Sequence, residues 1–141
     1  MSAFLPGILA GIIIAVVAQF LVGFVVDPLT NLKERIGDVE AALIFHANIY
    51  LNADAVQPEA RLETSKELRR AASDLLRALM LVSTEFMPRL LRLPPKEDID
   101  EAARLLIGLS NSVTGRSAEE NEKRRKEIRT KLRIPEPATS K

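Results

Sequence analysis

Apolar residues fill the start of the chain without interruption by charge. The first charged side chain is Asp27, and the run from Phe4 to Val26 contains a single polar side chain, the amide of Gln19. A helix needs about 20 apolar residues to cross the roughly 30 Å hydrocarbon core of a bilayer. The pattern therefore predicts a membrane-spanning helix, and we assign residues 1–27 to a transmembrane anchor.

Two other structures could account for such a run, and both fit less well. A secretory signal peptide has a basic start, a shorter apolar stretch and a small-x-small cleavage site. Met1 to Phe4 carries no basic side chain, and no convincing cleavage site follows the run. A buried core helix would need a larger apolar partner than the charged remainder of the chain offers. We therefore expect an uncleaved anchor.

Beyond the anchor, apolar positions recur at helical spacing. A second helix is expected from Asp27-Pro28, which ends or bends the span, to about Asn52. Its apolar seam alternates steps of three and four residues. A third helix is expected to start between Pro58 and Ser65 and to stop or kink at Pro88. The two seams are Leu29, Leu32, Ile36, Val39, Leu43, His46 and Tyr50, and Leu68, Ala72, Leu75, Leu79, Val82 and Phe86.

Two more helices follow the Pro94-Pro95 break. Glu97 and Asp98 suit the start of a fourth helix, and Gly115 suits its end. Ser117 and Glu120 have capping-box spacing and open a charged fifth helix that runs to about Arg133. With no strand pattern in the sequence, we predict an all-α fold: one transmembrane helix, a bundle of three or four helices over residues 28–134, and a flexible tail over residues 135–141.

Small residues in the span follow a regular spacing. Gly7, Gly11, Ala15, Gln19 and Gly23 are four apart, so they form one slanting stripe on a helix. Small residues let a neighbouring helix approach closely, which drives association in lipid. The amide of Gln19 would be costly against lipid but can bond to a second span. The stripe therefore predicts self-association, although glycine is also common in membrane helices for other reasons.

The stripe also leaves a pore open as an alternative. Each step of four residues drifts by about 40°, so the stripe winds nearly half-way round the helix. A dimer would use only part of it, whereas a ring, in which each helix touches two neighbours, would use all of it. A ring could place Gln19 against water and conduct ions.

Charge is confined to the rest of the chain and suggests an orientation. All 20 basic and 19 acidic residues follow Val26, so the net charge of +1 does not reveal that the N-terminal segment is uncharged and the rest of the chain highly charged. Lys33 and Arg35 follow the span, whereas its N-terminal side offers only the α-amino group. Because basic residues favour the cytoplasmic side, we expect a single-pass protein of the inner (cytoplasmic) membrane, with the N-terminus outside and the C-terminal domain in the cytoplasm.

The most basic stretch is Lys123, Arg124, Arg125 and Lys126. Nearby glutamates make a solvated helix with internal ion pairs the ordinary interpretation. The alternative is contact with anionic lipid headgroups. Nucleic acid is disfavoured as a partner because no stacking aromatic residue lies beside this stretch. We expect membrane lipid, further copies of this chain and a cytoplasmic protein as partners.

Residues that could support catalysis are scarce. His46 is the only histidine and falls in an apolar seam, and cysteine is absent, so we expect no catalytic residue, no metal site and no cofactor. No Gly-rich phosphate loop or Gly-x-Ser-x-Gly elbow occurs. The polar triplet Ser110-Asn111-Ser112 either bonds to a ligand or another helix, or marks a fraying helix end, which we favour.

Several short strings resemble a loosely defined group of small bacterial single-span membrane proteins with a cytoplasmic helical domain. These strings are Ile36-Gly37, Ala47-Asn48 and Leu106 to Ser112. The resemblance implies a bacterial membrane protein, but the group supplies no activity that could be carried over. The layout is also similar to small pore-forming accessory proteins of some RNA-targeting CRISPR systems, but their Arg-x4-6-His motif is absent, since the nearest arginine before His46 is Arg35.

These patterns lead to one functional hypothesis with two alternatives. We expect a non-enzymatic single-span membrane protein that self-associates through its span and presents a cytoplasmic helical bundle to a partner. An oligomeric ion-conducting pore is the first alternative, and a membrane-anchored enzyme is the second.

Overall fold

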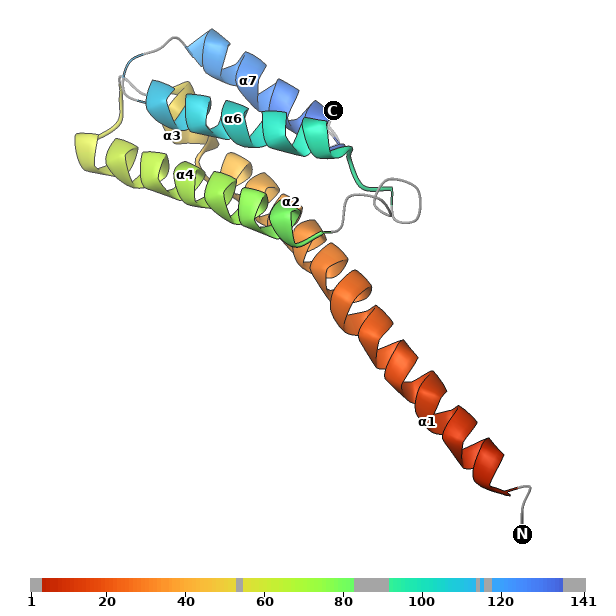
Figure 1. The fold of residues 1–141 in the computed structure, drawn as a ribbon. Coiled ribbons are helices and arrows are strands. Elements are labelled where there is room, and N and C mark those ends of the chain that lie inside the picture. The colour runs from red at the N-terminus through yellow and green to blue at the C-terminus, as the bar shows by residue number, and fades with distance from the viewer. Residues whose placement is uncertain (1–3, 53–54, 83–91, 114, 116–117, 136–141) are drawn as a thin grey trace, which may run out of the picture.

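The computed structural model describes residues 4–52, 55–82, 92–113, 115 and 118–135. Within these ranges the protein is all-α and contains no strand, which confirms the predicted fold class. One long helix carries the apolar N-terminal residues away from a bundle formed by the other helices (Figure 1).

The long helix consists of three consecutive segments. These are α1 (Phe4–Leu21), a π-helical turn η1 (Val22–Val26) and α2 (Asp27–Phe45). The second helix begins at Asp27 as expected, but no break precedes it. Leu21, Val26 and Asp27 all have right-handed helical backbone angles. The apolar helix therefore runs directly into the bundle, so that the bundle begins where the apolar surface ends.

The π turn explains how the helix passes through Pro28. Proline has no N–H, and its ring collides with the carbonyl four residues earlier, here that of Phe24. In η1 the N–H of Asp27 bonds to the carbonyl of Val22, five residues back instead of four. The wider turn changes the path of the backbone just before Pro28, and π turns and prolines are both sites at which helices bend.

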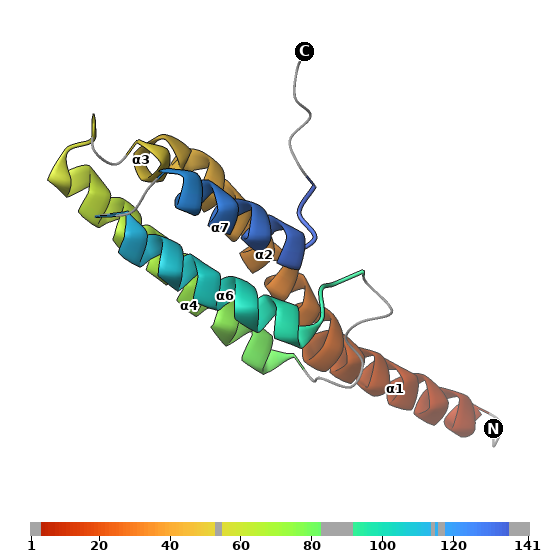
Figure 2. The ribbon, with the colours of Figure 1, turned by 90° about the horizontal axis from the view of Figure 1, so that it is seen from above.

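The bundle is built from α2, the short α3 (Ala47–Leu51), α4 (Pro58–Leu81), α6 (Lys96–Ser112) and α7 (Ala118–Lys131). Helix α4 lies between α2 and α6, and α7 covers α6 and α3 (Figures 1 and 2). Polar contacts show that sequential long helices run antiparallel. Arg69, midway along α4, bonds to Asn111 at the end of α6, and Figure 1 shows α4 and α6 running in opposite directions. Lys131 at the end of α7 pairs with Asp98 at the start of α6.

Two helix ends differ from the sequence prediction. Helix α4 ends at Leu81, and Val82 is already extended with φ −92° and ψ 124°, so the helix stops well before Pro88. Helix α6 ends at Ser112, before the expected stop at Gly115. Phe86, Pro88 and Ser117, as well as residues 136–141 of the tail, lie outside the described residues.

The core contains the predicted seams. Most of their members are at least nine-tenths buried, whereas Ile36 is only partly buried. Helix α6 contributes the face predicted for it, and Ile128, Leu132 and Ile134 hold the end of α7 against it. The buried seam residues are Leu29, Leu32, Val39, Leu43, Tyr50, Leu68, Ala72, Leu75, Leu79, Val82, Ile99, Ala102, Ala103, Leu106, Leu109 and Val113.

Helix α7 ends in a Schellman motif. The N–H of Ile134 bonds to the carbonyl of Arg129 at 2.9 Å, and that of Arg133 bonds to the carbonyl of Thr130 at 3.1 Å. This closure requires a left-handed residue, and Arg133 has φ 55°. A side chain with a Cβ is strained in that conformation, whereas glycine adopts it freely.

We therefore expect Arg133→Gly to raise the free energy of unfolding by about 1 kcal/mol. The matched control is Arg70→Gly, at an exposed position inside α4, which should lower the free energy of unfolding by about 1 kcal/mol. Thermal unfolding of the full chain in detergent, followed by circular dichroism, measures both. A loss of stability in Arg133→Gly would contradict the assigned motif.

Candidate functional site

The most conspicuous surface of the molecule is the exposed helix formed by α1 and η1. Its exposed large apolar side chains range from 49% exposure for Val26 to 70% for Phe24. Among the described residues, one helix is long and apolar enough to cross a membrane, and its most apolar window is not buried against any other part of the described structure. A helix that is apolar on every face needs an apolar surrounding.

The small-residue stripe lies open on this helix. Gly7, Gly11, Ala15, Gln19 and Gly23 are all exposed. A Cβ added at any of the three glycines would meet nothing within 4 Å. No contact within the described chain therefore requires glycine at these positions, although glycine costs a helix roughly 0.5–1 kcal/mol relative to alanine. Self-association through the stripe stays a prediction.

A second face of the span was not predicted from the sequence. Phe20 and Phe24 stack at a ring-centroid distance of 5.4 Å. With Val16, Val17, Leu21 and Val25 they line a shallow apolar hollow on the helix surface. Ala15 and Phe20 are five residues apart, about 140° round the helix, so the hollow lies on a different face from the middle of the stripe. The spacing of four between the two phenylalanines was the signal that could have revealed it.

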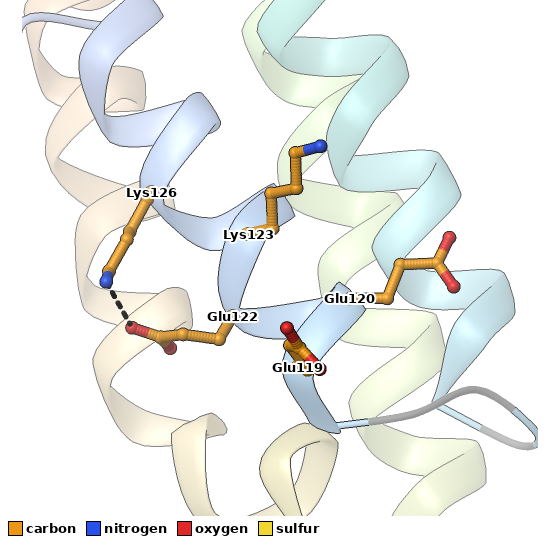
Figure 3. Close-up of a pocket in the computed structure, with 5 residues that line it drawn as sticks. All are labelled: Glu119, Glu120, Glu122, Lys123 and Lys126. Carbon is orange, nitrogen blue, oxygen red and sulfur yellow. Dashed lines mark ion pairs between the residues drawn. The ribbon is translucent and has the colours of Figure 1, made fainter.

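The basic stretch on α7 forms mostly local ion pairs. Arg124 pairs with Glu120 at 3.0 Å, and Arg125 pairs with Glu122 at 2.6 Å. Lys126 also reaches Glu122, at 3.8 Å (Figure 3). Lys123 points away from this pair (Figure 3), and it is one of the residues that line an open groove along α7. The ordinary interpretation of a solvated helix with internal ion pairs therefore accounts for most of the stretch.

The basic stretch lies far from the span along the bundle. Arg129 approaches Glu40 at 3.4 Å, and Glu40 is 13 residues, or about 20 Å of helix, beyond Asp27. Helix α7 runs back toward the span, so Lys123 to Lys126 lie farther from it than Arg129 does. Headgroup contact by these residues stays a prediction.

His46 is buried at the junction of α2 and α3. It is 5% exposed, and its Nδ1 lies 3.0 Å from Thr64 Oγ1. Its Nε2 lies 3.5 Å from a carboxylate oxygen of Glu67, which would make an ion pair only with a protonated ring. Thr64 and Glu67 both lie inside α4. The geometry describes a histidine that connects two helices.

A buried polar chain ties α3 to α6 and α7. The Asn121 Nδ2 donates to the carbonyl of Tyr50 at 2.7 Å, and the Ser112 hydroxyl lies 2.5 Å from Asn121 Oδ1. The Tyr50 hydroxyl donates to the carbonyl of Leu43 at 2.6 Å. Burial raises the pKa of Tyr50 to about 12, and the nearby guanidinium of Arg125 only partly opposes it. Each of these polar groups thus has a partner inside the fold.

The triplet Ser110-Asn111-Ser112 joins helices. Arg69 of α4 donates from Nε to the Ser110 hydroxyl at 3.2 Å and from Nη2 to Asn111 Oδ1 at 2.5 Å. Ser112 contacts Asn121 on α7, as described above. Our preference for a fraying helix end is therefore wrong, because all three side chains bond across helix interfaces.

No catalytic arrangement emerges from these contacts. Among the described residues, no group of three His, Cys, Asp or Glu side chains is placed to hold a metal ion. Comparison with protein families, with curated proteins and with solved structures finds no match to this chain. The described residues therefore define the protein as an all-α chain in which one helix is long and apolar enough to span a membrane.

The burial of the Tyr50 side chain can be tested by spectroscopy. It is the only tyrosine, and the chain has no tryptophan, so tyrosinate absorbance reports on Tyr50 alone. We expect half-ionisation of the folded protein near pH 12, compared with a pKa of 10.0 for a tyrosine in water. Because the folded pKa is raised, its contribution to stability is complete below pH 10 and is lost between pH 10 and 12, by about 2–3 kcal/mol.

The control for this titration is Tyr50→Phe, which removes the absorbance change and should unfold with a weaker dependence on pH in the same window. An ionisation midpoint near pH 10 in protein that is still helical would contradict the buried position of this side chain.

Proposed function

We propose that this chain is a non-enzymatic single-span membrane protein that self-associates through its span and presents a helical bundle to a cytoplasmic partner. The single observation that carries the proposal is the open glycine stripe, with its one amide, on a helix whose apolar surface is exposed.

The length of the helix supports its placement across a bilayer. Phe4 to Val26 covers 23 residues, or about 34 Å, which matches the roughly 30 Å hydrocarbon core with a modest tilt. Asp27 is the first charged residue and marks the end of this surface. Lys33 and Arg35 then follow on α2, which favours a cytoplasmic bundle and an external N-terminus.

The open stripe supports self-association. A Cβ at Gly7, Gly11 or Gly23 would meet nothing within 4 Å, so the stripe leaves room for the backbone of a second helix to approach closely. Gln19 lies in the same stripe, and its exposed amide would lack a hydrogen-bond partner in lipid. A second copy supplies both a close backbone and a matching amide, worth roughly 0.6–2 kcal/mol for the hydrogen bond.

The buried state of His46 supports a non-enzymatic role. A nucleophile or general base must reach substrate, but this ring is held between α2 and α4 by Thr64. The exposed remainder of the bundle is rich in ion pairs and suits protein recognition better than chemistry.

Added bulk in the stripe should weaken association. We expect Gly11→Leu combined with Ala15→Leu to shift the full-length protein in lipid toward monomers, because leucine keeps the backbones apart. The matched control is Ala10→Leu, five residues from Ala15 and thus about 140° round the helix, which should leave the distribution unchanged. Energy transfer between labelled copies in vesicles measures the populations. Equal behaviour of the two variants would contradict an interface at the stripe.

The amide of Gln19 should contribute separately. We expect Gln19→Leu to weaken association roughly 3- to 30-fold, the equivalent of 0.6–2 kcal/mol, by removing the interhelical hydrogen bond. Gln19→Asn, which keeps an amide, should retain part of the affinity. Unaltered association in Gln19→Leu would show that the amide does not face another span.

A further inference from the structure

The end of α4 carries an unexplained apolar surface outside the span. Met80 is 84% exposed and Leu81 is 60% exposed, and they are the last two residues of the helix. The residues beside them on the inner face, Leu79 and Val82, are buried. Met80 and Leu81 therefore point away from the core, where they stabilise nothing within the described chain.

Helices α2 and α4 lie side by side, and their alignment places Met80 and Leu81 level with the end of the span, measured along the axis of the long helix. His46, between α2 and α3, meets Thr64 of α4 at 3.0 Å, and the two long helices run antiparallel from there (Figure 1). From His46 back to Asp27 is 19 residues, about 28 Å, and from Thr64 on to Leu81 is 17 residues, about 26 Å. Measured along the axis of the long helix, Leu81 thus lies within a few ångströms of the level of Asp27.

A basic residue lies one turn behind the apolar pair. Arg77 is three and four residues before Met80 and Leu81, so the three side chains share a face of α4, and Arg77 is exposed. Because α4 runs toward the span, Arg77 lies farther from the proposed bilayer than Met80 and Leu81 do. Apolar residues at the acyl boundary with a basic residue one turn outward are typical of helices that touch a bilayer surface.

We propose that the C-terminal end of α4 is a second membrane contact, in which Met80 and Leu81 enter the boundary between headgroups and acyl chains and Arg77 contacts lipid phosphates. This inference rests on the proposed membrane span, because the bilayer must end near Asp27 for α4 to reach it. A contact at a second point would limit the tilt of the bundle relative to the bilayer.

The absence of cysteine in the sequence permits site-specific labelling of the full chain. We choose Met80→Cys, the span variant Ile13→Cys and the control Leu62→Cys, which lies at the opposite end of α4 and is 56% exposed. Each is labelled with an environment-sensitive fluorophore and inserted into vesicles of phosphatidylcholine and phosphatidylglycerol. Lipids that carry a nitroxide either high or low on the acyl chain then quench the fluorophores according to their depth.

We expect the shallow nitroxide to quench position 80 at least several-fold more than position 62, and the deep nitroxide to quench position 13 most. If position 13 is quenched but position 80 is quenched no more than position 62, the second contact is wrong while the span stands. If position 13 is not quenched by either lipid, the span itself fails. A shielded but unquenched fluorophore at position 80 would indicate contact between protein copies and would also overturn the proposal.

The role of Arg77 has its own matched control. In the Met80→Cys background, Arg77→Glu should reduce shallow quenching by half or more in anionic vesicles, because it replaces an attraction to phosphate with repulsion. Arg70→Glu makes the same change seven residues earlier on the same face, about 16 Å from Leu81, and should leave quenching unchanged. Equal quenching in the two charge variants would remove Arg77 from the contact.

Discussion

The uninterrupted helix from Phe4 to Phe45 is the constraint on which the architecture depends. Its apolar first half finds no partner in the described chain, while its second half supplies one wall of the bundle. Val25, in the π turn, already packs against the bundle core, so the two halves meet without a linker. A helix resists bending far more than a loop does. The orientation of the apolar helix therefore determines the orientation of the bundle.

Much of the fold could be predicted because core positions repeat with helical spacing. Leu32, Val39 and Leu43 are fully buried where the seam of α2 places them. The π turn could not be predicted, because Asp-Pro at the start of a helix looks the same whether or not a preceding helix continues into it. The end of α4 was also missed, since Val82 extends the apolar spacing and is buried, although its backbone has left the helix.

The candidate site could be predicted only where it depends on local spacing. The exposed stripe follows directly from residues four apart, as does the pairing of Arg124 with Glu120. The contact between Asn121 and Tyr50 joins positions 71 residues apart, and it forms only once α7 packs against α3. The buried guanidinium of Arg129 follows from the same kind of long-range packing, since it reaches Glu40 and the carbonyl of Pro135.

The π turn has a geometric consequence beyond its accommodation of proline. A π turn holds one residue more than an α turn, and one residue corresponds to about 100° of rotation in an α-helix. Every side chain of α2 is therefore turned by about that angle relative to a continuous α-helix. The side of the apolar helix on which the bundle lies is consequently fixed by a single hydrogen bond, from the N–H of Asp27 to the carbonyl of Val22.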